Sequence, residues 1–106
     1  MGILRSGFDD LLENGLIGDW CFHESTNGLE MFFRYPLRED DEKLGDWWPY
    51  SDAKTKGDVV RIPLTSKVEK NWGWNENKES PTLTPSINVV GRWHGFFRDG
   101  KLETLE

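Results

Sequence analysis

The sequence predicts an all-β fold, a small antiparallel barrel or sandwich of six to seven short strands with one short N-terminal helix. Two observations predict it: short stretches alternate apolar and polar residues, and Gly, Pro, Asn and Asp separate these stretches. The length of 106 residues fits a single domain spanning residues 1–106, and six Trp supply the bulk that a small core needs.

The helix is expected at about residues 7–14. Phe8, Leu11 and Leu12 are spaced to form one apolar stripe on a helix. Ser6 is the predicted N-cap, because its hydroxyl can accept a hydrogen bond from the first helical turn.

The β region is expected over about residues 19–105, and it opens with a hairpin. Asn27-Gly28 is a strong signal for a tight hairpin turn between two alternating stretches. The strand before the turn places Trp20 and Phe22 on one face. The strand after it directs four apolar side chains to one face, namely Leu29, Met31, Phe33 and Tyr35.

The later strands are shorter and less regular. Residues 58–64 alternate with Val60, Ile62 and Leu64 on one face, and residues 67–74 are the predicted fourth strand. Two further strands are expected at 87–90 and 92–98. Asp99-Gly100 then closes the last hairpin, with residues 101–105 pairing back.

A long loop over residues 36–57 carries the main binding hypothesis. It contains Trp47, Trp48 and Tyr50 close to a run of charged residues. Neighbouring residues of an extended segment point in opposite directions, so one of the two Trp is expected to be exposed. An exposed Trp beside carboxylates can hold a sugar or anchor a protein partner. The alternative is a loop that folds over the core with both rings buried.

Charge and composition exclude several classes of function. The formal net charge is −6, which disfavours binding to a nucleic-acid backbone. No apolar run is long enough to span a bilayer and no signal peptide is recognisable, so no membrane partner is expected. A single Cys excludes an internal disulfide, which fits a cytoplasmic location.

Few residues suggest catalysis or metal binding. Cys21 and His23 lie two apart on a predicted strand, and together with His94 they are the candidates for a metal site or a nucleophile–base pair. One Cys and two His fall below the usual ligand count for zinc, so no metal and no cofactor is predicted. Ser86 lacks the Gly-x-Ser-x-Gly context of a nucleophile elbow and is interpreted as the entry to a strand.

Five segments of the sequence follow one another in a distinctive order, namely Phe33–Pro36, Val59–Leu64, Trp72–Asn75, Ser80–Ile87 and Trp93–Gly100. In this order they resemble a family of small phage and bacterial proteins of unknown function. The resemblance covers about residues 32–105. Many phage members of that family carry the label "ammonia monooxygenase", which these residues do not support, because a membrane copper oxygenase needs membrane-spanning helices and a His-rich site.

The resemblance also implies a zinc site elsewhere in that family. Its members often carry Cys at the positions of Tyr35 and Trp93, next to a His that matches His94. Thiolates and imidazole in such places suit tetrahedral zinc. The implied expectation is that this chain has lost the metal and that Tyr35 and Trp93 fill its space.

The function expected from the sequence is therefore a non-enzymatic binding or accessory protein, plausibly phage-related. It would present the loop containing Trp47, Trp48 and Tyr50, together with His94 and Arg98, to a protein or a small ligand. The alternatives are a small metal-assisted or carboxylate-based enzyme and a carbohydrate-binding module. An exposed strand edge near Pro63 would permit a homodimer.

Overall fold

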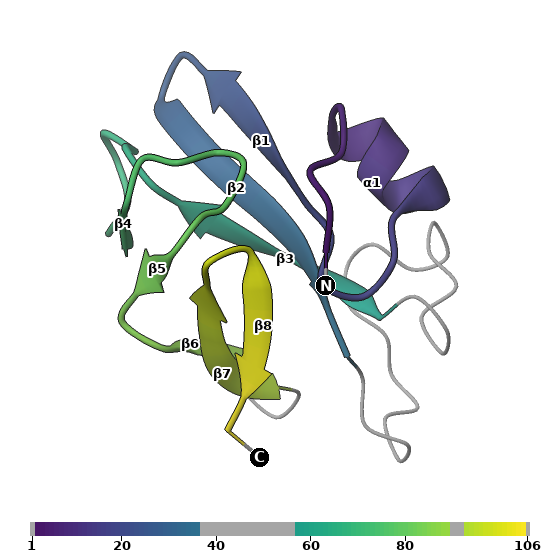
Figure 1. Cartoon of the computed structure of the whole chain (residues 1–106). Coiled ribbons are helices and arrows are strands. Elements are labelled where there is room, and N and C mark those ends of the chain that lie inside the picture. The colour runs from purple at the N-terminus through teal and green to yellow at the C-terminus, as the bar shows by residue number, and fades with distance from the viewer. Residues whose placement is uncertain (1, 37–56, 90–92, 106) are drawn as a thin grey trace.

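A computed structural model of the chain describes residues 2–36, 57–89 and 93–105. Within these residues the chain forms one short helix and three antiparallel sheets (Figure 1), which confirms the mainly β fold. The described strands do not close into a barrel, and their arrangement is sandwich-like. The elements are α1 (Phe8–Asn14), β1 (Trp20–Ser25), β2 (Gly28–Tyr35), β3 (Asp58–Pro63), β4 (Gly73–Trp74), β5 (Leu83–Thr84), β6 (Ile87–Val89), β7 (Trp93–Arg98) and β8 (Lys101–Thr104).

The first sheet, named here the N-terminal sheet, has the order β1-β2-β3. Ser25 pairs with Gly28 across the predicted tight turn, and Gly28 has a φ of 134°, which a residue with a side chain rarely adopts. Phe33 lies opposite Trp20 on one side and Val60 on the other. The predicted hairpin and its apolar face are therefore confirmed.

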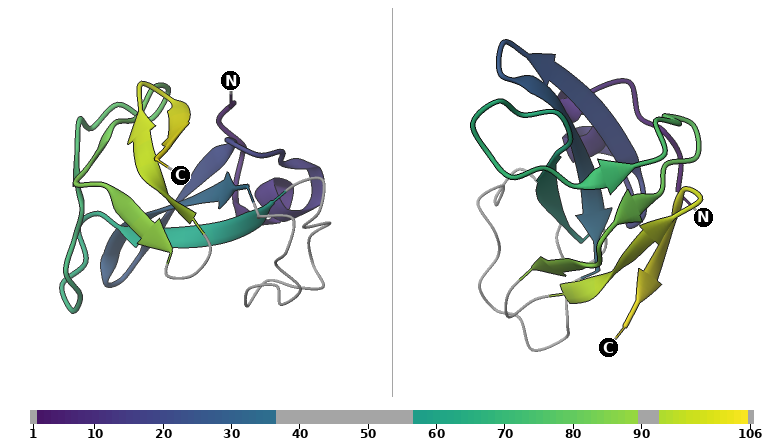
Figure 2. Two further views of the ribbon diagram at one scale, coloured as in Figure 1. Left: turned by 90° about the horizontal axis from the view of Figure 1, so that it is seen from below. Right: turned by 90° about the vertical axis from the view of Figure 1, so that its left-hand side faces the viewer.

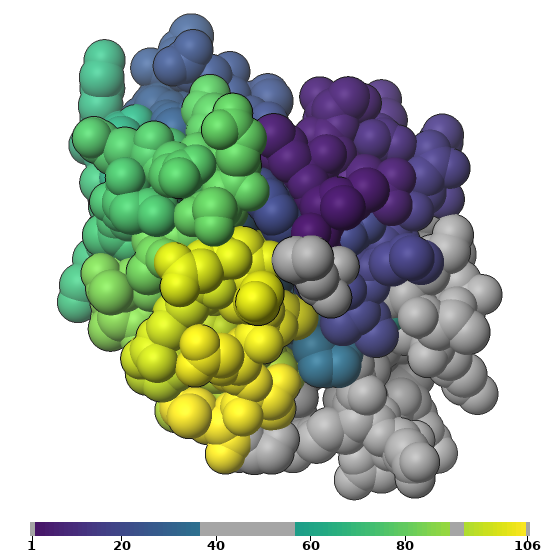
Figure 3. Space-filling model, viewed as in Figure 1, coloured from purple at the N-terminus to yellow at the C-terminus, as the bar shows by residue number. Residues whose placement is uncertain are grey.

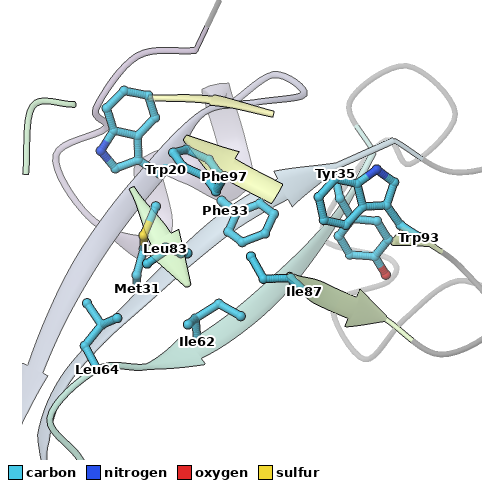
Figure 4. Close-up of a cluster of buried hydrophobic side chains, with 10 residues drawn as sticks. All are labelled: Trp20, Met31, Phe33, Tyr35, Ile62, Leu64, Leu83, Ile87, Trp93 and Phe97. Carbon is cyan, nitrogen blue, oxygen red and sulfur yellow. The ribbon is translucent and has the colours of Figure 1, made fainter. Parts of the chain in front are cut away.

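The main core lies between the N-terminal sheet and the smaller sheets of the second half of the chain (Figure 2). The last of these, named here the C-terminal sheet, has the order β6-β7-β8. Figure 4 shows the aromatic and aliphatic side chains that meet between the layers. The buried members of this core are Trp20, Met31, Phe33, Tyr35, Ile62, Leu64, Leu83, Ile87, Trp93 and Phe97.

The helix α1 covers the opposite face of the N-terminal sheet (Figure 1). Leu11 is fully buried there, and the Phe8 ring lies 4.7 Å from the Phe32 ring, centroid to centroid. Arg34 is also fully buried on this side and donates hydrogen bonds to the main-chain oxygens of Leu11 and Gly57. The helix thus covers the part of this face that holds Cys21, whereas His23 on the same face of β1 is exposed.

The start of the helix differs from the sequence prediction. Ser6 is not the N-cap: Gly7 occupies that position, and no side chain caps the helix. Asp10 instead accepts a hydrogen bond from the Ser6 main-chain N–H at 3.0 Å, so a carboxylate inside the first turn reaches back to the chain before the helix.

The part of the chain that the structure describes contains no helix with the length and apolar character needed to span a membrane.

The predicted fourth strand is wrong over most of its length. Only Gly73–Trp74 is a strand, and it pairs with β5. The chain before it forms a loop, in which Asn71 accepts a hydrogen bond from the Ser66 N–H at 2.7 Å and donates one to the Ser66 carbonyl. This side-chain pairing competes with strand formation, because the main-chain groups are satisfied locally.

Candidate functional site

The outward face of the C-terminal sheet, which points away from the core, carries polar side chains. Along β7, Trp93, Gly95 and Phe97 are buried, whereas His94 is half-buried and Arg98 is exposed. Side chains of a strand alternate between faces, so His94 and Arg98 point away from the core. The open face therefore lies opposite the packed aromatic layer.

Ser86 and His94 meet on this outward face. Ser86 immediately precedes β6, and the next two residues pair with β7, Ile87 with Gly95 and Asn88 with His94. This register places Ser86 and His94 on a diagonal of the hairpin, where side chains on one face are within reach. His94 Nε2 lies 3.1 Å from Ser86 Oγ. We call Ser86 and His94 the dyad.

The geometry of the dyad suits proton transfer. In the tautomer with its proton on Nδ1, His94 offers the Nε2 lone pair to the Ser86 hydroxyl, which is the arrangement that activates a serine nucleophile. Both side chains are half-buried, so the pair is accessible from solvent. No described side chain forms a hydrogen bond with Nδ1. Within the described residues the site is thus a pair, with Asn88 directly opposite His94 on the neighbouring strand.

The main chain of Ser86 adds a second feature. The Ser86 N–H donates to no acceptor among the described residues. In acyl transfer, the N–H of the nucleophile is one of the groups that can stabilise a developing oxyanion.

Phe96 and Arg98 extend the same face away from His94. The Arg98 guanidinium carbon lies 3.8 Å from the centre of the Phe96 ring, a stacking contact between cation and aromatic face. Arg98 Nη1 also donates to the Glu103 carboxylate at 3.2 Å. The predicted binding residues His94 and Arg98 therefore lie on one face of β7, and a role for them in binding stays a prediction.

Gly95 separates His94 from Phe96 and leaves no room for a side chain. A Cβ at Gly95 would collide with the main-chain oxygen of Glu103 and with the indole of Trp93. The Trp93 indole thus lies across the strand directly behind the dyad, and its Nε1 donates to the Thr104 hydroxyl at 2.9 Å.

The other candidates, Cys21 and His23, lie on the N-terminal sheet and do not join the dyad. Cys21 is fully buried beneath α1, and burial raises the pKa of its thiol to about 12. Such a thiol carries almost no thiolate near neutral pH and is a poor nucleophile or metal ligand. The His23 side chain is 57% exposed and lies 4.0 Å from the Glu30 carboxylate. Trp47, Trp48 and Tyr50 lie outside the described residues.

The zinc site implied by the resemblance does not fit the residues present. Tyr35 and Trp93 are both buried, and their rings lie 6.2 Å apart, centroid to centroid. These rings occupy positions where thiolates would be needed. Within the described ranges, no three residues of the metal-binding types His, Cys, Asp and Glu come together.

A surface pocket of about 420 Å³ lies away from the dyad. It is found where the N-terminal segment (purple) and the C-terminal hairpin (yellow) approach each other on the face shown in Figure 3. Neither Ser86 nor His94 is part of its wall. Its lining residues are Gly2, Ile17, Gly18, Lys101 and Leu102.

Sequence reasoning missed the dyad because it tested Ser86 against one local motif. Gly-x-Ser-x-Gly describes a strand-to-helix turn, and it does not apply to a serine that precedes a strand. The useful signal was the predicted pair of strands at 87–90 and 92–98. A short reversal between them places residues 86 and 94 on neighbouring strands.

Comparison with protein families supports an enzyme. A family model described as "Bacterial ubiquitination-like system serine protease (BubE)" matches residues 29–105, nearly the stretch covered by the resemblance found in the sequence. No curated protein and no solved structure matches the chain. The match contradicts the expected non-enzymatic binding or accessory protein, since the matching family consists of proteases. The chain belongs to the BubE family, described as the bacterial ubiquitination-like system serine protease.

Proposed function

We propose that this chain is a serine protease that cleaves a polypeptide in a bacterial ubiquitination-like system, with Ser86 as nucleophile and His94 as general base. The observation that carries the proposal is the 3.1 Å contact between Ser86 Oγ and His94 Nε2. The family description supports the same chemistry independently, because it names a serine protease without pointing to a particular serine.

The proposed reaction follows from the two side chains. His94 Nε2 removes the Ser86 hydroxyl proton as Oγ attacks the scissile carbonyl carbon, and the carbonyl oxygen becomes an oxyanion. The Ser86 N–H can donate one hydrogen bond to this oxygen. Protonated His94 then gives its proton to the leaving amine, and the C–N bond breaks to leave an ester on Ser86. Water, deprotonated by His94, hydrolyses that ester and restores the serine.

The surroundings of the dyad support a reaction at the surface. The Trp93 indole and the Phe97 ring lie on the core side of β7 and are buried in the packed layer. His94 therefore projects from a fixed strand, which favours a constant distance to Ser86.

Labelling with a small fluorophosphonate tests the proposal. Such a reagent reacts with an activated serine and forms a phosphonyl ester, which is located by peptide mass spectrometry. We expect the wild-type protein to be labelled at Ser86, and Ser86→Ala to be unlabelled. Ser25→Ala, which removes an exposed serine from the β1–β2 hairpin, is the matched control and should label normally. Labelling at a different serine, or undiminished labelling of Ser86→Ala, would contradict the proposal.

A further inference from the structure

The strand β6 lies at one edge of the C-terminal sheet, next to the nucleophile. The hydrogen bonds of the neighbouring strand β7 show which main-chain groups of β6 point away from the sheet. The Leu105 N–H donates to the His94 carbonyl at 2.9 Å, so the main-chain groups of His94 face β8. Neighbouring residues of an antiparallel strand direct these groups to opposite sides. Trp93 and Gly95 therefore face β6.

The register then determines the orientation of Asn88. Ile87 pairs with Gly95 and Val89 pairs with Trp93, so these two residues of β6 direct their N–H and C=O groups toward β7. Asn88 between them directs both groups away from the sheet. No described residue forms a main-chain hydrogen bond with Asn88 on that side, and Asn88 is exposed.

Unpaired main-chain groups at a sheet edge can recruit another strand. Proteins that bind extended peptides often add the peptide to such an edge, where main-chain hydrogen bonds supply affinity for any sequence. Here the part of this edge that is unpaired among the described residues begins two residues after Ser86. At about 3.3 Å of rise per residue, Asn88 lies about 7 Å along the strand from the nucleophile, which is the span of a short peptide segment.

We propose that the outer edge of β6 binds the substrate as an added antiparallel strand, and that one substrate residue exchanges two main-chain hydrogen bonds with Asn88. The inference rests on the proposed function, because it needs the scissile carbonyl to lie at Ser86. It names the substrate class: an extended segment or tail of a polypeptide, as opposed to the surface of a folded domain.

The antiparallel direction gives the register of the substrate. The chain of the substrate runs from Val89 toward Ser86, so the residue opposite Asn88 lies on the acyl side of the scissile bond. We count substrate residues from the scissile residue, which lies opposite Ser86, toward the substrate N-terminus. The third residue in this count pairs with Asn88. The second residue directs its N–H away from β6.

Peptide aldehydes test this register on the unaltered protein. A tetrapeptide aldehyde ends at the scissile position and forms a reversible adduct with an active-site serine. A mixture of such aldehydes, varied at each position, is screened for competition with fluorophosphonate labelling of Ser86. The best competitor is then remade with a single N-methyl group on either the third or the second residue. Methylation of the third residue should weaken competition about tenfold, since it removes one hydrogen bond and blocks the approach of the strand. Methylation of the second residue should have little effect.

Two variants of Asn88 provide the matching test on the protein. Asn88→Pro removes the outward N–H without removing a bond to β7, a position where a sheet edge tolerates proline. It should weaken competition by the aldehyde about tenfold, with competition expressed relative to the same variant's own rate of fluorophosphonate labelling, which needs no peptide. Asn88→Ala keeps the main chain and removes only the side chain, and it should behave like the wild type.

The outcomes separate the two proposals. Absence of fluorophosphonate labelling at Ser86 in the wild type would overturn the proposed function and this inference together. If Ser86 is labelled normally, three results would overturn the proposed binding at the edge of β6 alone. These are the absence of any competing aldehyde, equal effects of the two N-methyl groups, and weaker competition by the aldehyde in Asn88→Ala. The N-methyl pair decides the question even if Asn88→Pro fails to fold.

Discussion

Each of the two main sheets of this molecule carries a histidine together with a thiol or a hydroxyl group, and only one sheet brings the two side chains together. On the N-terminal sheet, Cys21 and His23 follow one another on the same face of β1, two residues apart. On the C-terminal sheet, Ser86 and His94 come from neighbouring strands and lie 3.1 Å apart. Two residues along a strand rise by about 7 Å, which is beyond hydrogen-bond reach for short side chains. Cross-strand diagonals, by contrast, allow contact.

Burial separates the two sheets as well. The helix α1 covers the part of the outer face of the N-terminal sheet that holds Cys21, whereas the described residues leave the outer face of the C-terminal sheet open around His94. A covered face contributes to stability and suppresses reactivity. An open face contributes little to the core and leaves its polar groups available for chemistry.

The largest expected effect concerns the two histidines. His94→Gln should lower the rate of ester hydrolysis, measured with p-nitrophenyl acetate, by about a thousandfold or more, because the serine loses its base. His23→Gln should change the rate of ester hydrolysis less than twofold, because His23 lies on the N-terminal sheet and is not part of the dyad. Equal losses in both variants would show that the dyad is not the reactive pair.

The next effect compares the buried and exposed arginines of the two sheets. Arg34→Met leaves the carbonyls of Leu11 and Gly57 without their buried donor, and it should reduce the free energy of unfolding by about 3 kcal/mol. Arg98→Met removes an exposed ion pair and should cost less than about 1 kcal/mol. Urea denaturation at neutral pH measures both. Similar losses in the free energy of unfolding for the two variants would contradict the larger effect expected for the buried arginine.

The buried thiol of Cys21 should make stability fall at high pH. Its pKa is raised in the folded protein to about 12 from an ordinary value of 9.0, because burial disfavours the thiolate. The resulting stabilisation is fully present below pH 9 and is lost as the pH rises toward 12, since the unfolded chain releases the proton first. Cys21→Ala should therefore lose less stability than the wild type across that range in thermal unfolding. Parallel curves for the two proteins would exclude this effect.

The same thiol should be protected from alkylation at pH 8. With a pKa of about 12, only about one thiol in ten thousand is ionised at that pH. We expect iodoacetamide to modify Cys21 only after denaturation, as followed by intact-protein mass. Rapid modification of the folded protein would show that α1 does not enclose the residue.

The smallest expected effect is on the exposed edge of the N-terminal sheet. Arg61 donates to both Glu30 and Glu69, and the hydrogen bond from Arg61 holds the pKa of Glu69 below its ordinary value of 4.5. A lowered carboxyl pKa gives stability that is present above pH 4.5 and lost as the pH falls below it. Glu69→Gln should therefore be slightly less stable at pH 7 and show a shallower loss below pH 4.5. The difference should disappear in 1 M salt.

Alternation and turn residues predicted much of this fold. Asn27-Gly28 marked the first hairpin, and the alternation of Met31, Phe33 and Tyr35 identified the face that enters the core. The predicted strand at 67–74 was wrong over most of its length, because Asn71 and Ser66 form hydrogen bonds with each other in a loop that competes with strand pairing. Local patterns record which face a residue takes, but they do not record competition between side-chain and main-chain partners.

The candidate site was harder to predict than the fold for a related reason. In the structure His94 lies on the outward face of β7, and its contact with Ser86 depends on the register of β6 against β7. A shift of one residue would place Ser86 on the opposite face. Reading Ser86 alone therefore favoured a strand entry, and only the paired strands show the contact.

Gly95 has a consequence for anyone who wishes to alter the specificity of this site. A saturation library across the outward face of β7 can vary Phe96 and Arg98 freely, but the position between His94 and Phe96 has a single admissible amino acid. Any side chain there would displace the Trp93 indole or the Glu103 main chain, and so move the strand that carries the base. Libraries that also randomise position 95 would consist mainly of inactive clones. The cause would be the lack of space for a side chain at that position, and not the chemistry of the dyad.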